Sequence, residues 1–184
     1  MWIGVARLIF AFALTAVVPA IFAQVQKAQP EKEETVFSED ESFKHPVPLP
    51  SGVAKVLLRD ELASQALDED ESEAAEAKPA KFFRATEVHL GASDEVALLV
   101  IGIPPMSGAD NGWFWVVRSP RKNPRVILTA GANSLAIMNT ATNGYKDIST
   151  AWSSPRETHE VVYHFDGKRY RLWREKQRAN PPEK

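Results

Sequence analysis

The chain has 184 residues, and its 22 Lys and Arg side chains nearly balance its 24 Asp and Glu side chains, which gives a formal net charge of −2. This balance excludes a wholly basic nucleic-acid binder and a wholly acidic disordered protein, while a hydrophobic content of 44% permits a packed core. The chain has no cysteine, which excludes disulfides, thiolate metal sites and a cysteine nucleophile.

The first 23 residues are typical of a secretory signal peptide. Arg7 precedes an uncharged apolar run over residues 8–23, which is shorter than the roughly 20 residues that a helix needs to cross a bilayer. We expect cleavage after Ala23, with Ala20 as the alternative, and no membrane span thereafter. The protein is then extracytoplasmic, either periplasmic or secreted, and an uncleaved membrane anchor is the competing interpretation.

The segment that follows the signal peptide changes composition twice. Residues 24–50 are polar, acidic and proline-bearing, which predicts a disordered spacer. Residues 51–67 predict one amphipathic helix, because Ser51 is a suitable N-cap and apolar residues recur four apart from Ala54 to Ala66. Residues 68–80 begin with an acidic run, for which we expect a mobile linker that coordinates no metal.

The remainder of the chain is rich in β-branched and aromatic residues separated by turn signals. Residues 81–176 predict a β-rich domain, and residues 177–184 predict a disordered basic tail. Short strands are expected near residues 85–90, 95–103, 113–118, 125–129, 134–139, 145–150, 159–165 and 168–173. The expected fold is therefore α+β and mainly β, an antiparallel meander of about eight short strands with the N-terminal helix packed on it. The second and third of these strands have apolar residues at both odd and even positions, so we expect them to be central and covered on both faces.

The last hairpin allows a register to be predicted. Asp166-Gly167 lies between two strand-like segments and favours a two-residue turn, which pairs Phe165 with Lys168. This register places His164, Arg169 and Arg171 together on the outer face, with Trp173 beside them. We therefore take His164, Arg169, Arg171 and Trp173 as the candidate ligand-binding residues.

Motifs for catalysis or metal binding are weak or missing. The sequence contains no nucleophile elbow, dinucleotide-binding glycine motif, P-loop or zincin motif, so no catalytic residue is assigned and no cofactor is expected. The segment from Asn139 to Asp147 has the spacing of a calcium loop, with Asn139, Asn143 and Asp147 at three ligand positions. One carboxylate and two amides are a poor calcium site, so we expect a hairpin with an Asn143-Gly144 turn and no metal.

The same segment carries a resemblance. Together with GADNGWFWVVR, TNGYKDI and FDGKRYR, it is similar to a group of uncharacterised exported bacterial β-rich proteins with a degenerate FG-GAP (integrin-like) repeat. The resemblance covers residues 82–173. It implies a β-rich exported domain and carries no activity or catalytic residue with it.

We expect an exported, non-catalytic binding or interaction protein of the cell envelope. Its basic last hairpin would contact an anionic envelope polymer or protein partner, and no nucleic acid is expected. Two alternatives stay open at this point: a hydrolase that acts on envelope material, and a proteinaceous inhibitor of such a hydrolase.

Overall fold

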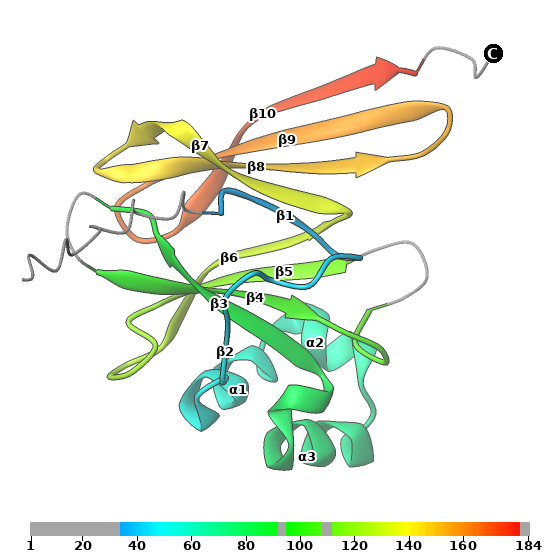
Figure 1. The fold of residues 1–184 in the computed structure, drawn as a ribbon, viewed down its shortest axis with the longest axis vertical. Coiled ribbons are helices and arrows are strands. Elements are labelled where there is room, and N and C mark those ends of the chain that lie inside the picture. Colours follow the sequence, from blue (N-terminus) through cyan, green and yellow to red (C-terminus); the bar gives the residue numbers. More distant parts are fainter. Residues whose placement is uncertain (1–33, 92–94, 108–111, 181–184) are drawn as a thin grey trace, which may run out of the picture. The chain divides into compact units, whose positions relative to one another are not determined.

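The computed structural model describes residues 34–91, 95–107 and 112–180, all of which belong to the unit that residues 33–184 form. The predicted signal peptide lies outside the described residues, and its cleavage stays a prediction. In the described part, ten strands build two five-stranded antiparallel sheets, and a few short helices precede β3 (Figure 1). The fold is α+β and mainly β, as the sequence predicts.

The two sheets divide the strands in chain order. The first sheet contains β2 (Pro46–Val47), β3 (Phe83–His89), β4 (Val96–Gly102), β5 (Gly112–Arg118) and β6 (Arg125–Ala132), hydrogen-bonded in that order. The second sheet contains β1 (Val36–Ser38), β7 (Ser134–Thr142), β8 (Tyr145–Ser153), β9 (Glu157–Phe165) and β10 (Tyr170–Ala179), also in that order. All eight expected strands are present as β3–β10, and the meander is split between two sheets.

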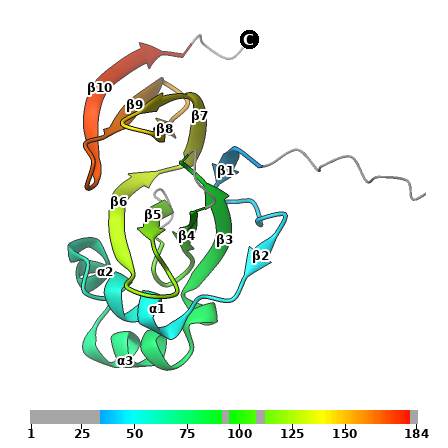
Figure 2. The same cartoon turned by 90° about the vertical axis from the view of Figure 1, so that its left-hand side faces the viewer.

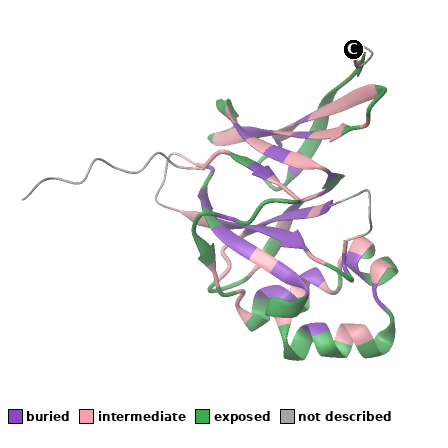
Figure 3. Ribbon diagram, turned by 45° about the vertical axis from the view of Figure 1, so that its right-hand side comes forward, coloured by how far each residue is buried: buried purple, intermediate pink, exposed green. Residues whose placement is uncertain are grey.

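The first sheet is buried on both faces. One face packs on the second sheet through a cluster that includes Leu99, Phe114 and Ile148, and the other packs under the helices through a cluster that includes Leu57, Val100 and Trp115. Figure 3 shows the resulting contrast between the buried strands of this sheet and the exposed β10 and outer helix surfaces. The prediction that β4 and β5 are central and doubly covered is confirmed, and it follows from their apolar residues at both parities.

The single helix expected over residues 51–67 is wrong, because the chain forms two short helices there. They are α1 (Ser51–Leu57) and α2 (Glu61–Ala66), and Asp60 between them has an extended backbone with φ −70° and ψ 142°. The carboxylate of Asp60 accepts a hydrogen bond from the Leu62 N–H (3.2 Å) and begins a new helix. The Asp60 cap thus divides the apolar residues from Ala54 to Ala66 between two helices, although their spacing alone predicts one continuous helix.

The acidic run is a helix rather than a mobile linker. Helix α3 (Glu69–Ala77) begins at a capping box, in which Asp68 accepts from the Glu71 N–H and the Glu71 side chain accepts from the Asp68 N–H. Ala75 is buried, and an ion pair of 2.9 Å joins Lys55 to Glu76. A 3-10 turn (Pro79–Lys81) then leads into β3. Three acidic side chains in the first turn of α3 also suit the positive end of the helix dipole.

Part of the predicted spacer is also ordered. Strands β1 and β2 lie within residues 24–50, and Phe37 and Phe43 are buried with their rings in an edge-to-face contact at 5.8 Å. Burial of two aromatic side chains offsets the entropic cost of ordering this polar segment. Likewise, β10 continues to Ala179, so the predicted tail is ordered at least to that residue.

The chain passes from the first sheet to the second at Asn133. Its backbone carbonyl accepts from the Glu39 N–H (3.0 Å), its side-chain amide donates to Glu39 (2.7 Å), and its amide oxygen accepts from the Ser153 N–H (2.7 Å). These bonds satisfy the polar groups that the corner would otherwise leave unpaired. The corner makes β6 the last strand of the first sheet, and β5 is the strand with which it pairs.

The register of the last hairpin differs from the prediction by two residues. Phe165 pairs with Tyr170, not with Lys168, because residues 166–169 form a four-residue turn in which Asp166 accepts from the Lys168 N–H (2.8 Å) and the Arg169 N–H (2.9 Å). A shift of two residues preserves the two faces, so His164 and Arg171 remain neighbours. Arg169, however, lies in the turn instead of on the strand, and a bulge between Leu172 and Arg174 leaves Trp173 out of the pairing.

Candidate functional site

Two basic segments that are far apart in the sequence meet beside β6. One is the connection between β5 and β6, and the other is the turn between β9 and β10. A cavity of about 570 Å³ lies between them and is lined by Arg118, Ser119, Asn123, Arg125, Ile127, Gly167 and Lys168. The positive φ of Gly167 (97°) allows the tight turn that brings Lys168 to this position.

A second cavity continues along the same strand. Its volume is about 300 Å³, and it is lined by Asp60, Val126, Ile127, Leu128, Thr129, Tyr163, Arg169, Tyr170 and Arg171. Ile127 lines both cavities, so the two cavities are adjacent along β6. We call the two cavities, with these lining residues, the β6 groove.

The cations of the β6 groove fall into two groups. Arg118 is paired with Glu95, and Arg171 is paired with Asp166 at 2.9 Å. Arg125, Lys168 and Arg169 form no ion pair within the part of the chain that the structure describes. Among the described residues, the groove therefore presents three exposed cations without an ion pair, although the formal net charge of the whole chain is −2.

The one aspartate that lines the groove is held by hydrogen bonds from neutral groups. Asp60 accepts at Oδ1 from the Leu62 N–H and from the Trp115 indole N–H (3.2 Å each), and at Oδ2 from the Thr129 hydroxyl (3.0 Å). Both carboxylate oxygens are thus used to join α2, β5 and β6. The bond to Thr129 also marks the end of the groove along β6.

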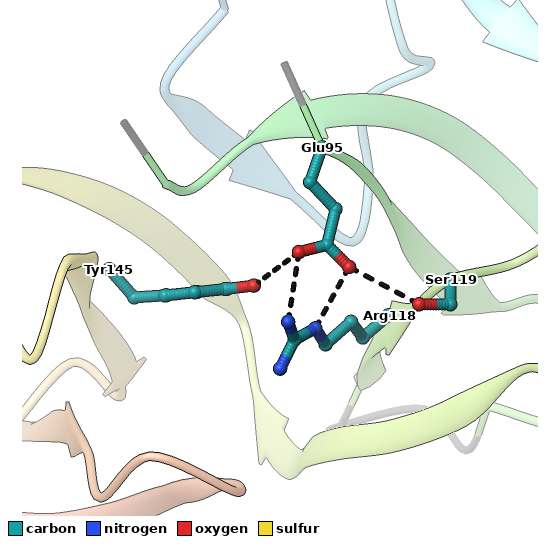
Figure 4. A network of polar contacts seen from close by, with 4 residues as sticks. All are labelled: Glu95, Arg118, Ser119 and Tyr145. Atoms are coloured by element: carbon teal, nitrogen blue, oxygen red, sulfur yellow. Dashed lines mark hydrogen bonds and ion pairs between the residues drawn. The ribbon is translucent and has the colours of Figure 1, made fainter. Parts of the chain in front are cut away.

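A polar network fixes Arg118 at the opposite end (Figure 4). Arg118 donates from Nε and Nη2 to the two oxygens of Glu95 at 2.8 and 3.0 Å, while Ser119 (3.2 Å) and Tyr145 (2.8 Å) also donate to Glu95. The hydrogen bonds from Arg118, followed by that from Tyr145, lower the pKa of Glu95 from 4.5 to about 2, although partial burial opposes this change. The network joins the first sheet to β8 of the second through the hydrogen bond from Tyr145 to Glu95 (Figure 4).

Tyr145 links this network to the hairpin that carries Lys168. Its ring is stacked on Phe165 at 4.2 Å, and the Arg118 guanidinium lies 5.3 Å from its centroid. Burial, followed by the hydrogen bond to Glu95, raises the pKa of the Tyr145 hydroxyl. The two walls of the groove are therefore held together by packed aromatic rings as well as by the hydrogen bond from Tyr145 to Glu95.

The turn that presents Lys168 and Arg169 is itself held by Asp166. Hydrogen bonds from the backbone N–H groups of Arg169 and Lys168, together with that from the Arg171 side chain (2.9 Å), lower the pKa of Asp166 to about 2. Asp166 therefore stays ionised over the whole physiological range, and it braces the turn through its acceptor oxygens.

The four candidate ligand-binding residues do not form one cluster. Two of them, Arg169 and Arg171, line the β6 groove. His164 and Trp173 line neither cavity. Their rings are stacked on each other at 4.3 Å, and Trp173 is 56% exposed. Arg171 is the register partner of His164, so these two and Trp173 remain neighbours. The prediction that all four residues share one outer face is wrong for Arg169, because residues 166–169 form a four-residue turn.

Residues outside the predicted set complete the groove. Arg118, Arg125 and Lys168 belong to basic segments that are evident in the sequence, but no local pattern indicates that these segments meet. Asp166-Gly167 and the prolines of the β5–β6 connection do show that both segments are turns. Their meeting depends on the corner at Asn133, which has no sequence signal.

The calcium-like segment forms the expected hairpin. Asn143 and Gly144 have φ values of 52° and 80° and connect Thr142 to Tyr145, as a two-residue turn requires. The Asn143 amide donates to the Phe165 carbonyl (2.7 Å), while Asn139 is exposed near an irregularity of β7. Asp147 is buried, with Oδ2 at 3.7 Å from His164 Nε2 and Oδ1 without a hydrogen bond among the described residues.

The acidic run does not neutralise the groove. Among the described residues its ion pair is the one between Lys55 and Glu76, and none joins it to the β9–β10 turn. In Figure 1 α3 and the β9–β10 hairpin lie at opposite ends of the described unit. Within the residues that the structure describes, no acidic side chain forms an ion pair with Arg125, Lys168 or Arg169.

Comparison with known proteins gives no relative: no protein-family model, no curated protein and no solved structure matches this chain. The resemblance to exported proteins with a degenerate FG-GAP segment accordingly stays a prediction. A search for membrane-spanning helices over the described residues finds none that is long and apolar enough.

Proposed function

We propose that this protein is an exported, non-catalytic binding protein of the cell envelope that holds an anionic partner in the β6 groove. The observation that carries this proposal is the position of Arg125, Lys168 and Arg169, three cations without an ion pair in the described residues, on the walls of two adjacent cavities along β6. Cations concentrated in a groove with low-dielectric walls raise the local concentration of anions.

The composition of the groove favours binding over hydrolysis. A hydrolase on envelope material needs a carboxylate or another titratable group free to move a proton. Asp60, the groove's carboxylate, has both oxygens engaged by protein donors. An inhibitor would be expected to present a protruding loop to its target enzyme. The groove is concave instead, which fits a protein that receives an extended or protruding ligand.

Titration with inorganic tripolyphosphate tests the proposal, because this anion carries several negative charges and therefore probes the recognition of charge alone. Calorimetry on the mature chain should show binding that weakens steeply between about 50 and 300 mM salt, since the charges are solvent-accessible. The double variant Arg125→Gln plus Lys168→Gln should weaken binding roughly five- to tenfold, which corresponds to about 1–1.4 kcal/mol.

A matched control separates the groove from overall charge. Arg156→Gln plus Lys176→Gln removes the same two charges from exposed positions at the far end of the β9–β10 hairpin. It should leave the affinity within about twofold of the parent, since those charges lie beyond a Debye length from the groove. An equal loss in both double variants, or no loss in either, would contradict the proposal.

A further inference from the structure

Charges of opposite sign line the smaller cavity of the β6 groove without pairing with each other. Asp60 and Arg169 both lie on its wall, yet no ion pair joins them in the described residues. The other arginine of this cavity, Arg171, is paired with Asp166. Figure 2 shows where the two charges come from: α2, which Asp60 caps, lies below β6, and the β9–β10 turn lies above it. The cavity therefore keeps a carboxylate and a guanidinium apart.

The Asp60 carboxylate has no cationic partner in the part of the chain that the structure describes. Its hydrogen-bond donors are the Leu62 N–H, the Trp115 indole and the Thr129 hydroxyl, all of which are neutral. The residue is half-buried, so water compensates its charge only in part. A cation bound at this place would therefore be stabilised by the carboxylate.

The remaining acceptor capacity of Asp60 suits an ammonium group. The two oxygens of a carboxylate offer about four lone-pair sites. Oδ1 accepts from Leu62 and Trp115, whereas Oδ2 accepts from Thr129 alone and keeps a free site. A guanidinium favours both oxygens at once, but an ammonium acts as a point charge and can bind a single oxygen. Asp60 accordingly favours a primary ammonium.

The same cavity has apolar walls that suit an aliphatic spacer. Val126 and the ring of Tyr163 line it and are partly exposed. Asp60 contacts β6 at Thr129, and the two cavities meet two residues away at Ile127, a distance of roughly 7 Å at about 3.3 Å per residue. A ligand that reaches from the carboxylate to the cations therefore needs a spacer, and a hydrocarbon chain would lose its contact with water against these walls.

We propose that the ligand of the β6 groove is an anion that also carries a primary ammonium, with the ammonium on Asp60 and the anionic group on Arg169. This inference rests on the proposed function and names the class of its ligand. Arg169 and the other exposed cations attract the anionic end. Asp60 then discriminates among anions, because it repels a chain that is anionic throughout and binds one that ends in an ammonium.

Two phosphate monoesters that differ in one group test the proposal. Aminohexyl phosphate carries an ammonium at the far end of its chain, and hydroxyhexyl phosphate has a neutral hydroxyl at the same place. Calorimetry on the mature protein at low salt should show roughly fivefold tighter binding of the aminohexyl compound, because only its ammonium can pair with Asp60. A groove that recognised negative charge alone would prefer the hydroxyhexyl compound, and that result, or equal affinity, would overturn the inference.

Two aspartate variants locate the ammonium site. Asp60→Asn keeps an acceptor oxygen for Leu62 and Trp115, removes the charge, and should abolish the preference for the aminohexyl compound. It should also strengthen tripolyphosphate binding by up to about threefold, which shows at the same time that the variant is folded. Asp68→Asn removes the same charge from the exposed cap of α3 and should leave the preference unchanged.

The arginine variant and the joint outcomes complete the test. Arg169→Gln should weaken both phosphate monoesters and preserve their affinity ratio, since it removes only the contact with the anionic end. A preference that persists in Asp60→Asn would place the ammonium elsewhere and overturn the inference. Tripolyphosphate binding without any preference for the aminohexyl compound would overturn the ammonium site and leave the proposed function standing. If none of the three anions binds, the proposed function fails as well.

Discussion

Replacement of Asp60 with alanine is expected to lower the free energy of unfolding by about 2–4 kcal/mol. Asp60 caps α2 and accepts from the Trp115 indole and the Thr129 hydroxyl. Trp115 is fully buried, so its N–H would lose its partner without access to water. Urea unfolding followed by circular dichroism measures the change.

A cap in an exposed position provides the control for Asp60. Asp68 begins α3 with a capping box but contacts no buried polar group, so Asp68→Ala should cost only about 1 kcal/mol. If Asp60→Ala costs no more than Asp68→Ala, then the bonds to Trp115 and Thr129 do not contribute to stability, and Asp60 is only a helix cap.

Replacement of Glu95 with glutamine is expected to lower the stability of the fold and to raise its affinity for anions. It should lower stability at neutral pH by about 1–2 kcal/mol, because it removes the charge that Arg118 and Tyr145 bind, and partial exposure screens part of that interaction. It should also raise the affinity for tripolyphosphate a few-fold, because Arg118 lines the groove and would no longer be neutralised.

The pH dependence of stability distinguishes the Glu95 effect from a general loss of packing. The pKa of Glu95 falls from 4.5 to about 2 on folding, so its contribution is complete above pH 4.5 and is lost as the pH falls towards 2. The stability difference between the parent and Glu95→Gln should therefore shrink across that window. A constant difference from pH 6 to pH 2 would show that the charge of Glu95 does not stabilise the fold.

Glu87 provides a matched variant for the Glu95 result. It pairs with Arg121 at 2.9 Å, but the Arg121 side chain is 81% exposed and the pair has no further donor in the described residues. Exposed ion pairs of this kind contribute about 0–1 kcal/mol. Glu87→Gln should accordingly change stability little and leave the affinity of the groove unaltered.

The strands could be predicted from the sequence because their signals are local. The apolar run of β4 and the turn signals Asn143-Gly144 and Asp166-Gly167 each depend on a few adjacent residues. The strand positions, the fold class and the doubly covered centre follow from such patterns. Exact register does not, since Asp166 satisfies two backbone N–H groups and thereby lengthens the turn.

The groove could be predicted only in part, because it depends on contacts between distant residues. Arg169 and Arg171 were candidates from the hairpin alone. Arg118 and Arg125 join them because the chain turns at Asn133 and Tyr145 connects the two sheets. Helix α3 was missed for a related reason: an acidic composition suggests a solvated linker, whereas the capping box and the pair with Lys55 stabilise a helix.

The ligand footprint on the protein tests the anion groove most directly. Amide chemical shifts of the isotope-labelled mature protein are followed by NMR during titration with tripolyphosphate. The account predicts that perturbations concentrate in residues 118–129 and 166–171, on both walls of the β6 groove, and that α3 is unaffected. Perturbations confined to residues 173–179, the exposed end of β10, would contradict it and place the anion on a solvated basic strand.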